Sequence, residues 1–375
     1  MVKIPNMWRG VWPMSDGGIP VVTQSMVTSF VSCPREVYYS SVLGLRPRLS
    51  TIPLTRGTWV HALLEAKANG LDWRAKHEEI SSRYAAETFS EESDSLAEEC
   101  YNIVTSYEWK YRDDPLETIA AELTVERPML DGQVLYRGRI DLIARDKHGD
   151  IWLVDHKTHR SFPDWRYREL AFQHYSYLWA CGGASQYLDL GLPQPKGFIY
   201  DYCKTGTIRT PTILKSTKIS RAFKPEYCPY PVLREWLLRH GYLTEVGGET
   251  LIAVEDPEER SYIRDIMYES KIQKDSSLFR RDYMQFTPAQ AQRQLRSFMR
   301  STYRMMCYRW DNPDFIERNL HACSGYTCSY RDLTTADLVH GTSHIEQETR
   351  YVKTSDPLDY YPEQNKRTQE KGHEA

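Results

Sequence analysis

The sequence predicts an α/β fold in which helices cover a mixed β-sheet. Runs rich in β-branched and aromatic residues have the pattern of strands; they lie at 119–128, in two paired runs within 138–158, and at 196–203. Apolar residues recur at helical spacing at 56–66, and another helix is expected at about 169–180. A helix, three strands, a second helix and a further strand, in this order, predict a sheet with helices packed against it.

Length and composition are those of a large globular protein. The chain has 375 residues, of which 41% are apolar, and its net charge of −3 indicates no general affinity for nucleic acid, so any basic surface must be local. The N-terminus lacks the apolar segment of a signal peptide and no run of eighteen apolar residues occurs, so we expect a cytoplasmic protein without membrane contact. In that compartment the eight cysteines are expected to be free thiols or metal ligands rather than disulfides.

The stretch 138–158 predicts a β-hairpin that carries three functional side chains. A polar turn at 146–150 joins a first strand with Asp141 to a second strand with Asp155 and Lys157. Strand side chains alternate in direction, so Asp155 and Lys157 share a face and His156 points away. Two carboxylates and an ammonium would converge there, as in sites where divalent cations polarise a water. The alternative is a surface hairpin whose charges are solvated.

Two neighbouring segments offer further candidates for such a site. On the expected helix at 56–66, Gly57 and His61 lie on one stripe; an isolated histidine there is usually a hydrogen-bonded core residue, but beside a metal site it is a candidate ligand. Gly57 would allow a close backbone approach. On the strand at 119–128, Glu122 and Glu126 share a face, and Glu126 is a candidate carboxylate, although a solvated strand edge is the favoured interpretation.

Four short patterns occur in the order found in the PD-(D/E)XK nuclease superfamily, and they resemble its RecB-like exonuclease branch. They are Gly57-x3-His61-x2-Leu64-Glu65, Gly138-x2-Asp141, Asp155-x-Lys157-Thr158 and Gln173-x3-Tyr177. The resemblance covers about residues 56–205. It implies a restriction-endonuclease-like core and metal-dependent hydrolysis of DNA, by an exonuclease acting on ends or single strands in recombination, repair or phage replication. An endonuclease and a non-cutting DNA-binding factor of this fold are the alternatives.

The resemblance also implies roles for individual residues. Mg²⁺ or Mn²⁺ would be bound by Asp141, Asp155, the backbone carbonyl of His156, and His61, whose nitrogen favours Mn²⁺. Lys157 would orient or deprotonate the attacking water. Gln173 and Tyr177 would position Lys157 or the DNA backbone. The partners implied are DNA and the proteins of recombination or replication.

A second resemblance concerns the cysteines outside the core. The iron–sulfur members of this branch, including phage and CRISPR-associated nucleases, place one cysteine before the core and three after it. Cys33, Cys323 and Cys328 match three of these positions, but Thr334 stands where the fourth cysteine is expected. A [4Fe–4S] cluster would therefore need Cys307, His321 or an exogenous ligand. A zinc site, or a clasp held by packing without metal, are the alternatives.

The resemblance and the pattern together divide the chain into five segments. We expect an N-terminal arm with Cys33 at 1–55, the nuclease core at 56–205, a connecting insertion at 206–290, a C-terminal helix and cysteine clasp at 291–345, and a disordered tail at 346–375. The long helix expected between Pro288 and Trp310 carries one basic stripe, formed by Arg293, Arg296, Arg300 and Arg304. It could follow a DNA backbone, but a solvated face is the favoured interpretation.

Overall fold

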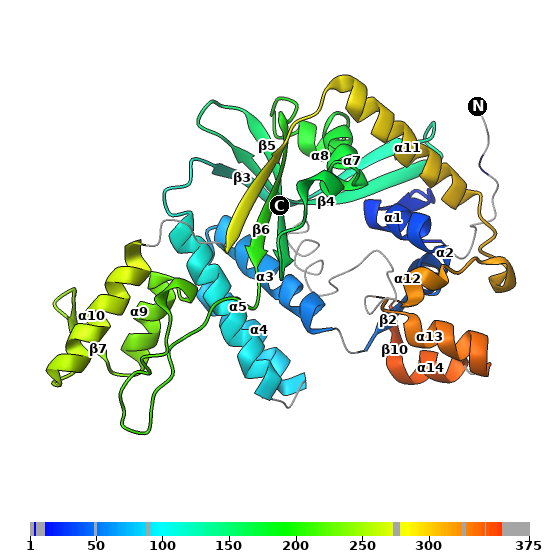
Figure 1. Ribbon diagram of the computed structural model, residues 1–375. Helices are drawn as coiled ribbons and strands as arrows, with labels where there is room; N and C mark the ends of the chain where they lie inside the picture. Colours follow the sequence, from blue (N-terminus) through cyan, green and yellow to red (C-terminus); the bar gives the residue numbers. More distant parts are fainter. Residues whose placement is uncertain are drawn as a thin grey trace.

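A six-stranded mixed sheet forms the centre of the protein (Figure 1). The computed structural model describes residue 4 and residues 12–48, 51–87, 91–272, 278–324, 328–341 and 343–354. The strands run in the order β1 (Val21–Val22), β4 (Val134–Arg145), β5 (Ile151–His159), β6 (Gly197–Lys204) and β9 (Phe279–Met284), and β3 (Glu117–Met129) pairs with β4. β5 is parallel to β6 and β1 is parallel to β4, whereas the other pairs are antiparallel. The α/β fold expected from the sequence is confirmed.

The hairpin of β4 and β5 forms as expected, for reasons that are local to its turn. Asp146 Oδ1 accepts hydrogen bonds from the backbone N–H groups of His148 and Asp150, and Gly149 adopts a φ of 86° that favours glycine. The two strands pair from Arg145 opposite Ile151 to Leu142 opposite Val154. β3 pairs with β4 along nearly its whole length, so β1 and β5 share the opposite edge of β4. Asp141 therefore lies where β4 and β5 separate.

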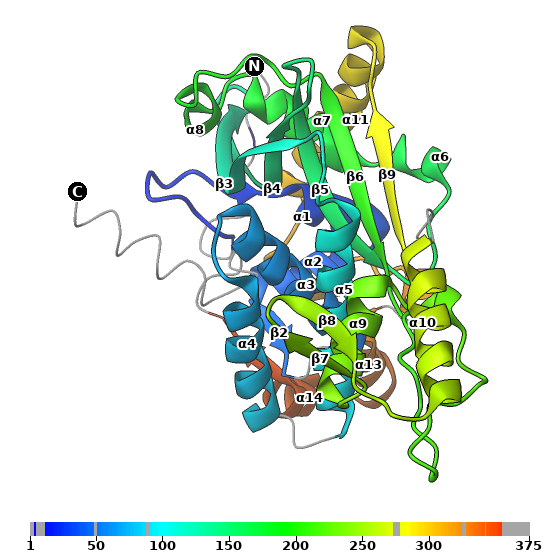
Figure 2. The ribbon, with the colours of Figure 1, turned by 90° about the vertical axis from the view of Figure 1, so that its left-hand side faces the viewer.

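Helices cover both faces of the sheet (Figures 1 and 2). One face carries α3 (Ile52–Ala68) and α5 (Glu91–Lys110), and α4 (Trp73–Glu87) packs against these two helices. The other carries α1 (Gln24–Ser32), α7 (Phe172–Cys181) and α11 (Pro288–Met306). Thr23 caps α1, because its side chain accepts a hydrogen bond from the Met26 N–H.

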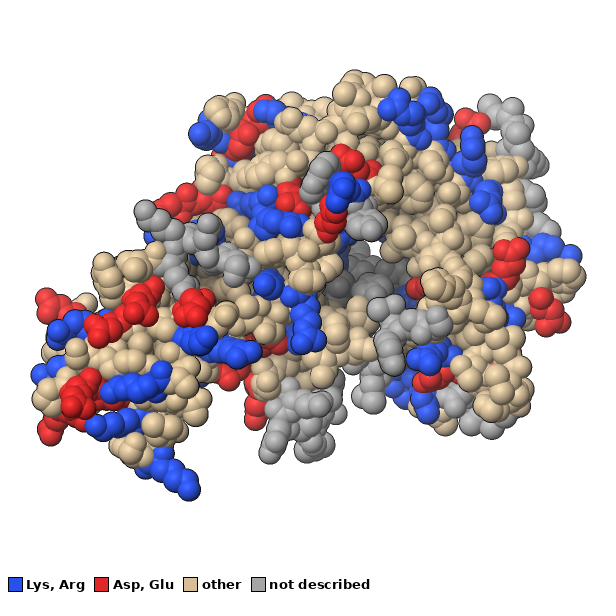
Figure 3. Space-filling model, viewed as in Figure 1, with Lys and Arg blue, Asp and Glu red and all other residues tan. Residues whose placement is uncertain are grey.

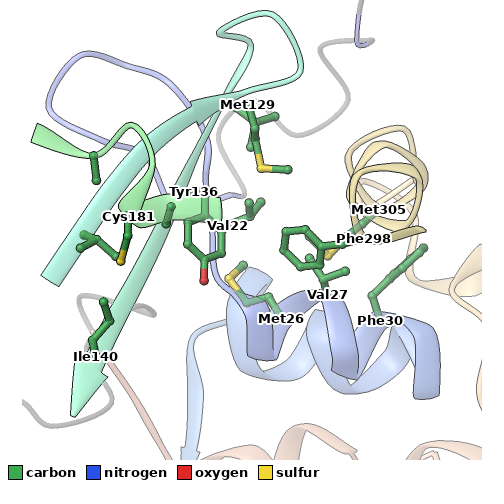
Figure 4. Packing of buried hydrophobic residues seen from close by; sticks show 14 of the residues in the cluster. Val22, Met26, Val27, Phe30, Met129, Tyr136, Ile140, Cys181, Phe298 and Met305 are labelled. Carbon is green, nitrogen blue, oxygen red and sulfur yellow. The ribbon is translucent and has the colours of Figure 1, made fainter. Parts of the chain in front are cut away.

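The core beneath α1, α7 and α11 is built from large side chains of all three helices and the sheet. Phe298 of α11 contacts Tyr136 of β4, with ring centroids 5.9 Å apart, and lies next to Val27 of α1 in Figure 4. All three side chains are fully buried. Burial of one such side chain contributes about 1.5–3 kcal/mol relative to leaving it exposed. The Tyr136 hydroxyl also donates to Ser176 Oγ of α7 at 3.0 Å. α7 is thereby held against β4, and both elements carry expected site residues.

The basic stripe of α11 lies on the side of the helix away from this core. Arg293, Arg296, Arg300 and Arg304 are all exposed, and Figure 3 shows Lys and Arg side chains along this edge of the protein. Thr287 and Gln290 form a capping box at the start of the helix. The helix and its amphipathic pattern are therefore as expected from the sequence.

The region expected as a connecting insertion, 206–290, contains both a separate module and a strand of the sheet. α9 (Tyr230–Arg239), β7 (Leu243–Val246), β8 (Glu249–Ile252) and α10 (Pro257–Ile272) pack around their own apolar cluster. The module meets α5 through the Tyr101 hydroxyl, which donates to Glu235 Oε1 at 2.6 Å. The chain then returns to the sheet as β9, so the core extends beyond residue 205.

The clasp joins the N-terminal arm to the C-terminal segment. β2 (Leu45–Pro47) pairs with β10 (Tyr351–Lys353), and the buried Arg35 donates to the Pro313 carbonyl oxygen at 2.6 Å and pairs with Asp337. Short helices complete this region; they are α2 (Pro34–Val37), α12 (Leu320–Ser324), α13 (Arg331–Thr335) and α14 (Ser343–Arg350). The expectation of a disordered tail from residue 346 is wrong as far as residue 353, because α14 and β10 continue the fold; residues 355–375 lie outside the described residues.

No helix in the described ranges is long and apolar enough to cross a membrane.

Candidate functional site

Asp141 lies at the centre of a buried polar group between α3, β4 and β5. Its Oδ2 accepts a hydrogen bond of 2.9 Å from the backbone N–H of His156 and lies 3.3 Å from His61 Nδ1. Burial alone would raise the pKa of Asp141, but His61, Lys157 and the His156 N–H outweigh it, so the pKa is lowered. Asp141 is therefore ionised, and its carboxylate is suited to bind a cation.

Glu122 is the third member of this group, and the sequence interpretation did not select it. β3 pairs Ala121 with Leu142 and Leu123 with Ile140, which places Glu122 opposite Asp141. His61, Glu122 and Asp141 each offer one ligand atom, and these atoms lie within 4.8 Å of one another. Burial, followed by the charge of Asp141, raises the pKa of Glu122 to about 8, although Arg139 Nε lies 2.6 Å from its Oε2.

Glu126, the carboxylate that the sequence offered as a candidate, lies elsewhere on β3. It pairs with Arg137 at 2.6 Å and is not a member of the metal-capable group. The signal that could have found Glu122 is the register of β3 against β4. That register is set by the tight turn between Met129 and Val134 and fixes which residue faces Asp141.

Lys157 and Gln173 both bind Asp155. Lys157 Nζ lies 2.6 Å from Asp155 Oδ2, and Gln173 Nε2 donates to Asp155 Oδ1 at 2.6 Å. Burial lowers the pKa of Lys157, but Asp155 and Asp141 outweigh it, so the pKa is raised and the ammonium is charged. Burial raises the pKa of Asp155, in opposition to Lys157. Asp155 and Lys157 share a face of β5, as their alternation predicts.

Two glycines bring the four sequence patterns together. A Cβ atom on Gly138 would lie 2.7 Å from Tyr177 Cε1, so only glycine lets the Tyr177 ring pack on β4. A Cβ atom on Gly57 would lie 3.3 Å from Thr158 Oγ1, which shows how closely α3 approaches β5. These approaches place His61 and Tyr177 beside the hairpin. The Tyr177 hydroxyl also interacts with the Gln173 side chain.

The His156 side chain points away from this site, into a second buried polar cluster. Its Nδ1 lies 3.7 Å from Asp201 Oδ2, which accepts hydrogen bonds from the Tyr107 hydroxyl at 2.6 Å and Arg281 Nε at 3.0 Å. The N–H and C=O of one strand residue point to the same edge, so the His156 carbonyl faces the side of Asp141. No sequence pattern singled out Tyr107, Asp201 or Arg281, because they come from the three separate elements α5, β6 and β9.

The donor set fits a hard divalent cation. Ligand atoms on opposite sides of one Mg²⁺ lie about 4.2 Å apart, which agrees with a group confined within 4.8 Å. Two carboxylates and one imidazole nitrogen suit Mg²⁺ or Mn²⁺. Asp155 adjoins the group, but its oxygens contact Lys157 and Gln173.

The cysteine clasp brings three thiols together but offers no fourth. Cys323 contacts the side chains of Cys33, Cys328 and Thr334, so the Thr334 hydroxyl stands beside the three sulfurs. The Cys307 thiol contacts Tyr303 instead, and His321 is exposed. Burial raises the pKa of Cys328 to about 11, so its thiol is protonated. These residues do not fit a four-thiolate cluster, and within the described ranges no cysteine belongs to a metal-capable group.

Comparison with protein families identifies the architecture that surrounds the site. The model of the PD-(D/E)XK nuclease superfamily matches residues 21–333, a range that contains all four sequence patterns. Members of this superfamily are generally nucleases that use divalent metals. The comparison with curated proteins gave no match. The match covers more than half of the chain, and the protein therefore belongs to the PD-(D/E)XK nuclease superfamily.

Proposed function

We propose that this protein is a metal-dependent deoxyribonuclease, and specifically an exonuclease that acts on DNA ends or single strands during recombination, repair or phage replication. The observation that carries the proposal is the group of His61, Glu122 and Asp141, whose ligand atoms lie within 4.8 Å of one another. The Lys157–Asp155 ion pair adjoins it on the same hairpin. The site therefore has both the donors for a cation and a fixed positive charge for a phosphate.

The metal would be Mg²⁺ or Mn²⁺, bound by Asp141, His61 and Glu122. Asp155 and the His156 carbonyl would complete the set, since both border the same space. Bound there, the metal would lower the pKa of a water and neutralise charge that develops on the phosphate. Mn²⁺ is favoured over Mg²⁺ because one donor is an imidazole nitrogen.

The main role of Lys157 would be that of a cation, and not that of a base. Its ammonium is held at 2.6 Å by Asp155, so it can orient a water or a phosphate oxygen without moving far. To accept a proton from water it would first have to lose its own, which the two neighbouring carboxylates oppose. Gln173 fixes Asp155 from the other side, and Tyr177 holds Gln173, so both residues position the pair rather than touch the reacting atoms.

The test is a time course on linear DNA labelled at either end and on circular DNA, with Mn²⁺ and with Mg²⁺. An exonuclease shortens the linear DNA progressively and leaves the circle intact. Asp141→Asn and Lys157→Ala should abolish the activity. Glu126→Gln is the matched control, because it removes a carboxylate of β3 that pairs with Arg137 outside the site.

The other outcomes separate the alternatives. Cleavage of the circle would identify an endonuclease. Wild-type protein that binds DNA and leaves it intact with each metal would refute the nuclease proposal in favour of a non-cutting factor.

A further inference from the structure

Arg168 is a structurally fixed cation beside the candidate active site. It ends the short helix α6 (Trp165–Arg168), which in the sequence connects β5 to α7, the elements that carry Lys157 and Gln173. In Figure 2, α6 lies at the outer side of the sheet, next to β9. Its Nε donates to the Tyr202 hydroxyl at 2.9 Å, and its Nη2 lies 3.0 Å from His159 Nε2. The guanidinium also lies over the rings of Tyr200 and Tyr202, at 4.9 and 5.6 Å from their centroids.

Unlike its neighbours, Arg168 has no carboxylate partner among the described residues. Arg280, which lies over the Tyr202 ring at 5.0 Å, pairs with Asp282 at 2.8 Å. Arg166 on the same helix pairs with Asp164. No carboxylate of the described residues therefore neutralises the positive charge of Arg168.

The partners of Arg168 are neutral acceptors that orient it without cancelling its charge. Burial and the neighbouring cations, Arg168 first among them, lower the pKa of His159, so its ring is uncharged and its Nε2 can accept a hydrogen bond. Tyr202 is fully buried and its hydroxyl accepts the Nε–H. An arginine has five N–H donors, so three remain for a ligand. A half-buried cation held in this way is arranged to bind an anion.

We propose that Arg168 forms a phosphate-binding subsite that takes one backbone phosphate of the DNA strand beside the bond that is hydrolysed. The inference rests on the proposed function, because it assigns the anion to the substrate of that site. The planar guanidinium matches two oxygens of a phosphate, and arginine is less strongly hydrated than lysine. Arg168 lies close enough to Lys157 for the two charges to interact, so both would act on the same short stretch of strand.

The test combines a variant with a scan of the substrate. End-labelled oligonucleotides carry a neutral methylphosphonate at one backbone position at a time, and kcat/KM is measured for wild-type protein and for Arg168→Gln. A charge-assisted hydrogen bond is worth about 1.5–3 kcal/mol, so Arg168→Gln should lower kcat/KM about 10- to 100-fold. One methylphosphonate position should lower the wild-type value by a similar factor. In Arg168→Gln that same position should have almost no further effect, because the two changes remove one contact.

Matched variants separate a phosphate contact from general loss of charge or of folding. Arg166→Gln removes an exposed arginine of the same helix and should leave kcat/KM within about twofold. Arg168→Lys should restore part of the loss, since it keeps the charge but not the two-oxygen geometry. If Arg168→Gln is destabilised, the scan is repeated with Arg168→Lys, in which the sensitive position should lose part of its effect.

Two results would overturn the inference while leaving the proposed function intact. One is wild-type cleavage with no single sensitive phosphate, and the other is an equal loss in Arg166→Gln and Arg168→Gln. If the wild-type protein does not cleave DNA, its binding of the same oligonucleotides with Mn²⁺ is compared with that of Arg168→Gln. A position-specific loss of affinity there would retain the phosphate subsite and reject only the nuclease proposal, whereas equal affinities would reject the subsite.

Discussion

Metal binding should release a proton from Glu122, and the number of protons released per metal follows from the raised pKa of this residue. Its pKa is raised to about 8, so about 90% of the side chain is protonated at pH 7 and about 10% at pH 9. A carboxylate ligand must be deprotonated. The apparent affinity for Mn²⁺ should therefore rise with pH up to about 8 and then level off. The release due to Glu122 should be about 0.9 proton per metal at pH 7 and about 0.1 at pH 9.

Calorimetric titration in two buffers of different ionisation enthalpy measures this proton number. Glu122→Gln should lose the pH-dependent part and bind Mn²⁺ more weakly, whereas Glu126→Gln should behave as wild type. Equal proton release from wild type and Glu122→Gln would refute the assignment of Glu122 as a ligand.

The same pKa predicts how stability depends on pH without metal. The folded-state pKa of Glu122 lies above its ordinary value of 4.5, so its contribution to stability is fully present below about pH 4.5 and is lost as pH rises towards 8. A rise of the folded-state pKa from 4.5 to about 8 changes the free energy of unfolding by at most about 5 kcal/mol between low and high pH. Glu122→Gln should therefore stabilise the metal-free protein at pH 8 and not at pH 4. Urea unfolding at both pH values measures the difference.

Three further outcomes are expected. Gly138→Ala should cost about 1–3 kcal/mol in urea unfolding and reduce cleavage, because the new Cβ would lie 2.7 Å from Tyr177 Cε1; unchanged stability and activity would contradict the close approach. Arg35→Met should lower stability by about 1–3 kcal/mol and speed proteolysis of the clasp, because the Pro313 carbonyl loses its hydrogen bond while Asp337 keeps its ion pair with Arg318; an intact proteolysis pattern would argue otherwise. Protein purified without oxygen should contain no stoichiometric iron, since Thr334 stands beside the three clasp thiols, and a brown protein with four irons would show that an external ligand completes the cluster.

The elements that the sequence predicted are those specified by local patterns. The turn at Gly149 and the alternation of Asp155, His156 and Lys157 fix the hairpin within some twenty residues, so its geometry followed from the sequence. The periodicity of α11 was equally local. These patterns needed no knowledge of distant parts of the chain.

The features that the sequence did not predict depend on pairing between distant segments. Glu122 faces Asp141 only because of the β3–β4 register, and its φ of 54° is unusual for a glutamate. β9 and β10 are short strands whose partners lie far away in the chain, so their sequences resemble connections and tails. The cluster around Asp201 is formed by residues of α5, β6 and β9, and the sequence of any one of these elements does not predict its contact with the other two.

The clasp also constrains when the protein can finish folding. Arg35 and Asp337 are 302 residues apart, and β2 finds its partner only in residues 351–353. During synthesis at about 5–20 residues per second, the N-terminal arm would wait about 15–60 s for these partners to be made. In that interval Arg35 lacks its ion pair and β2 lacks its partner strand, so the arm is open to non-native pairing. The structure thus links the order of synthesis to the closure of the fold, independently of the chemistry at Asp141.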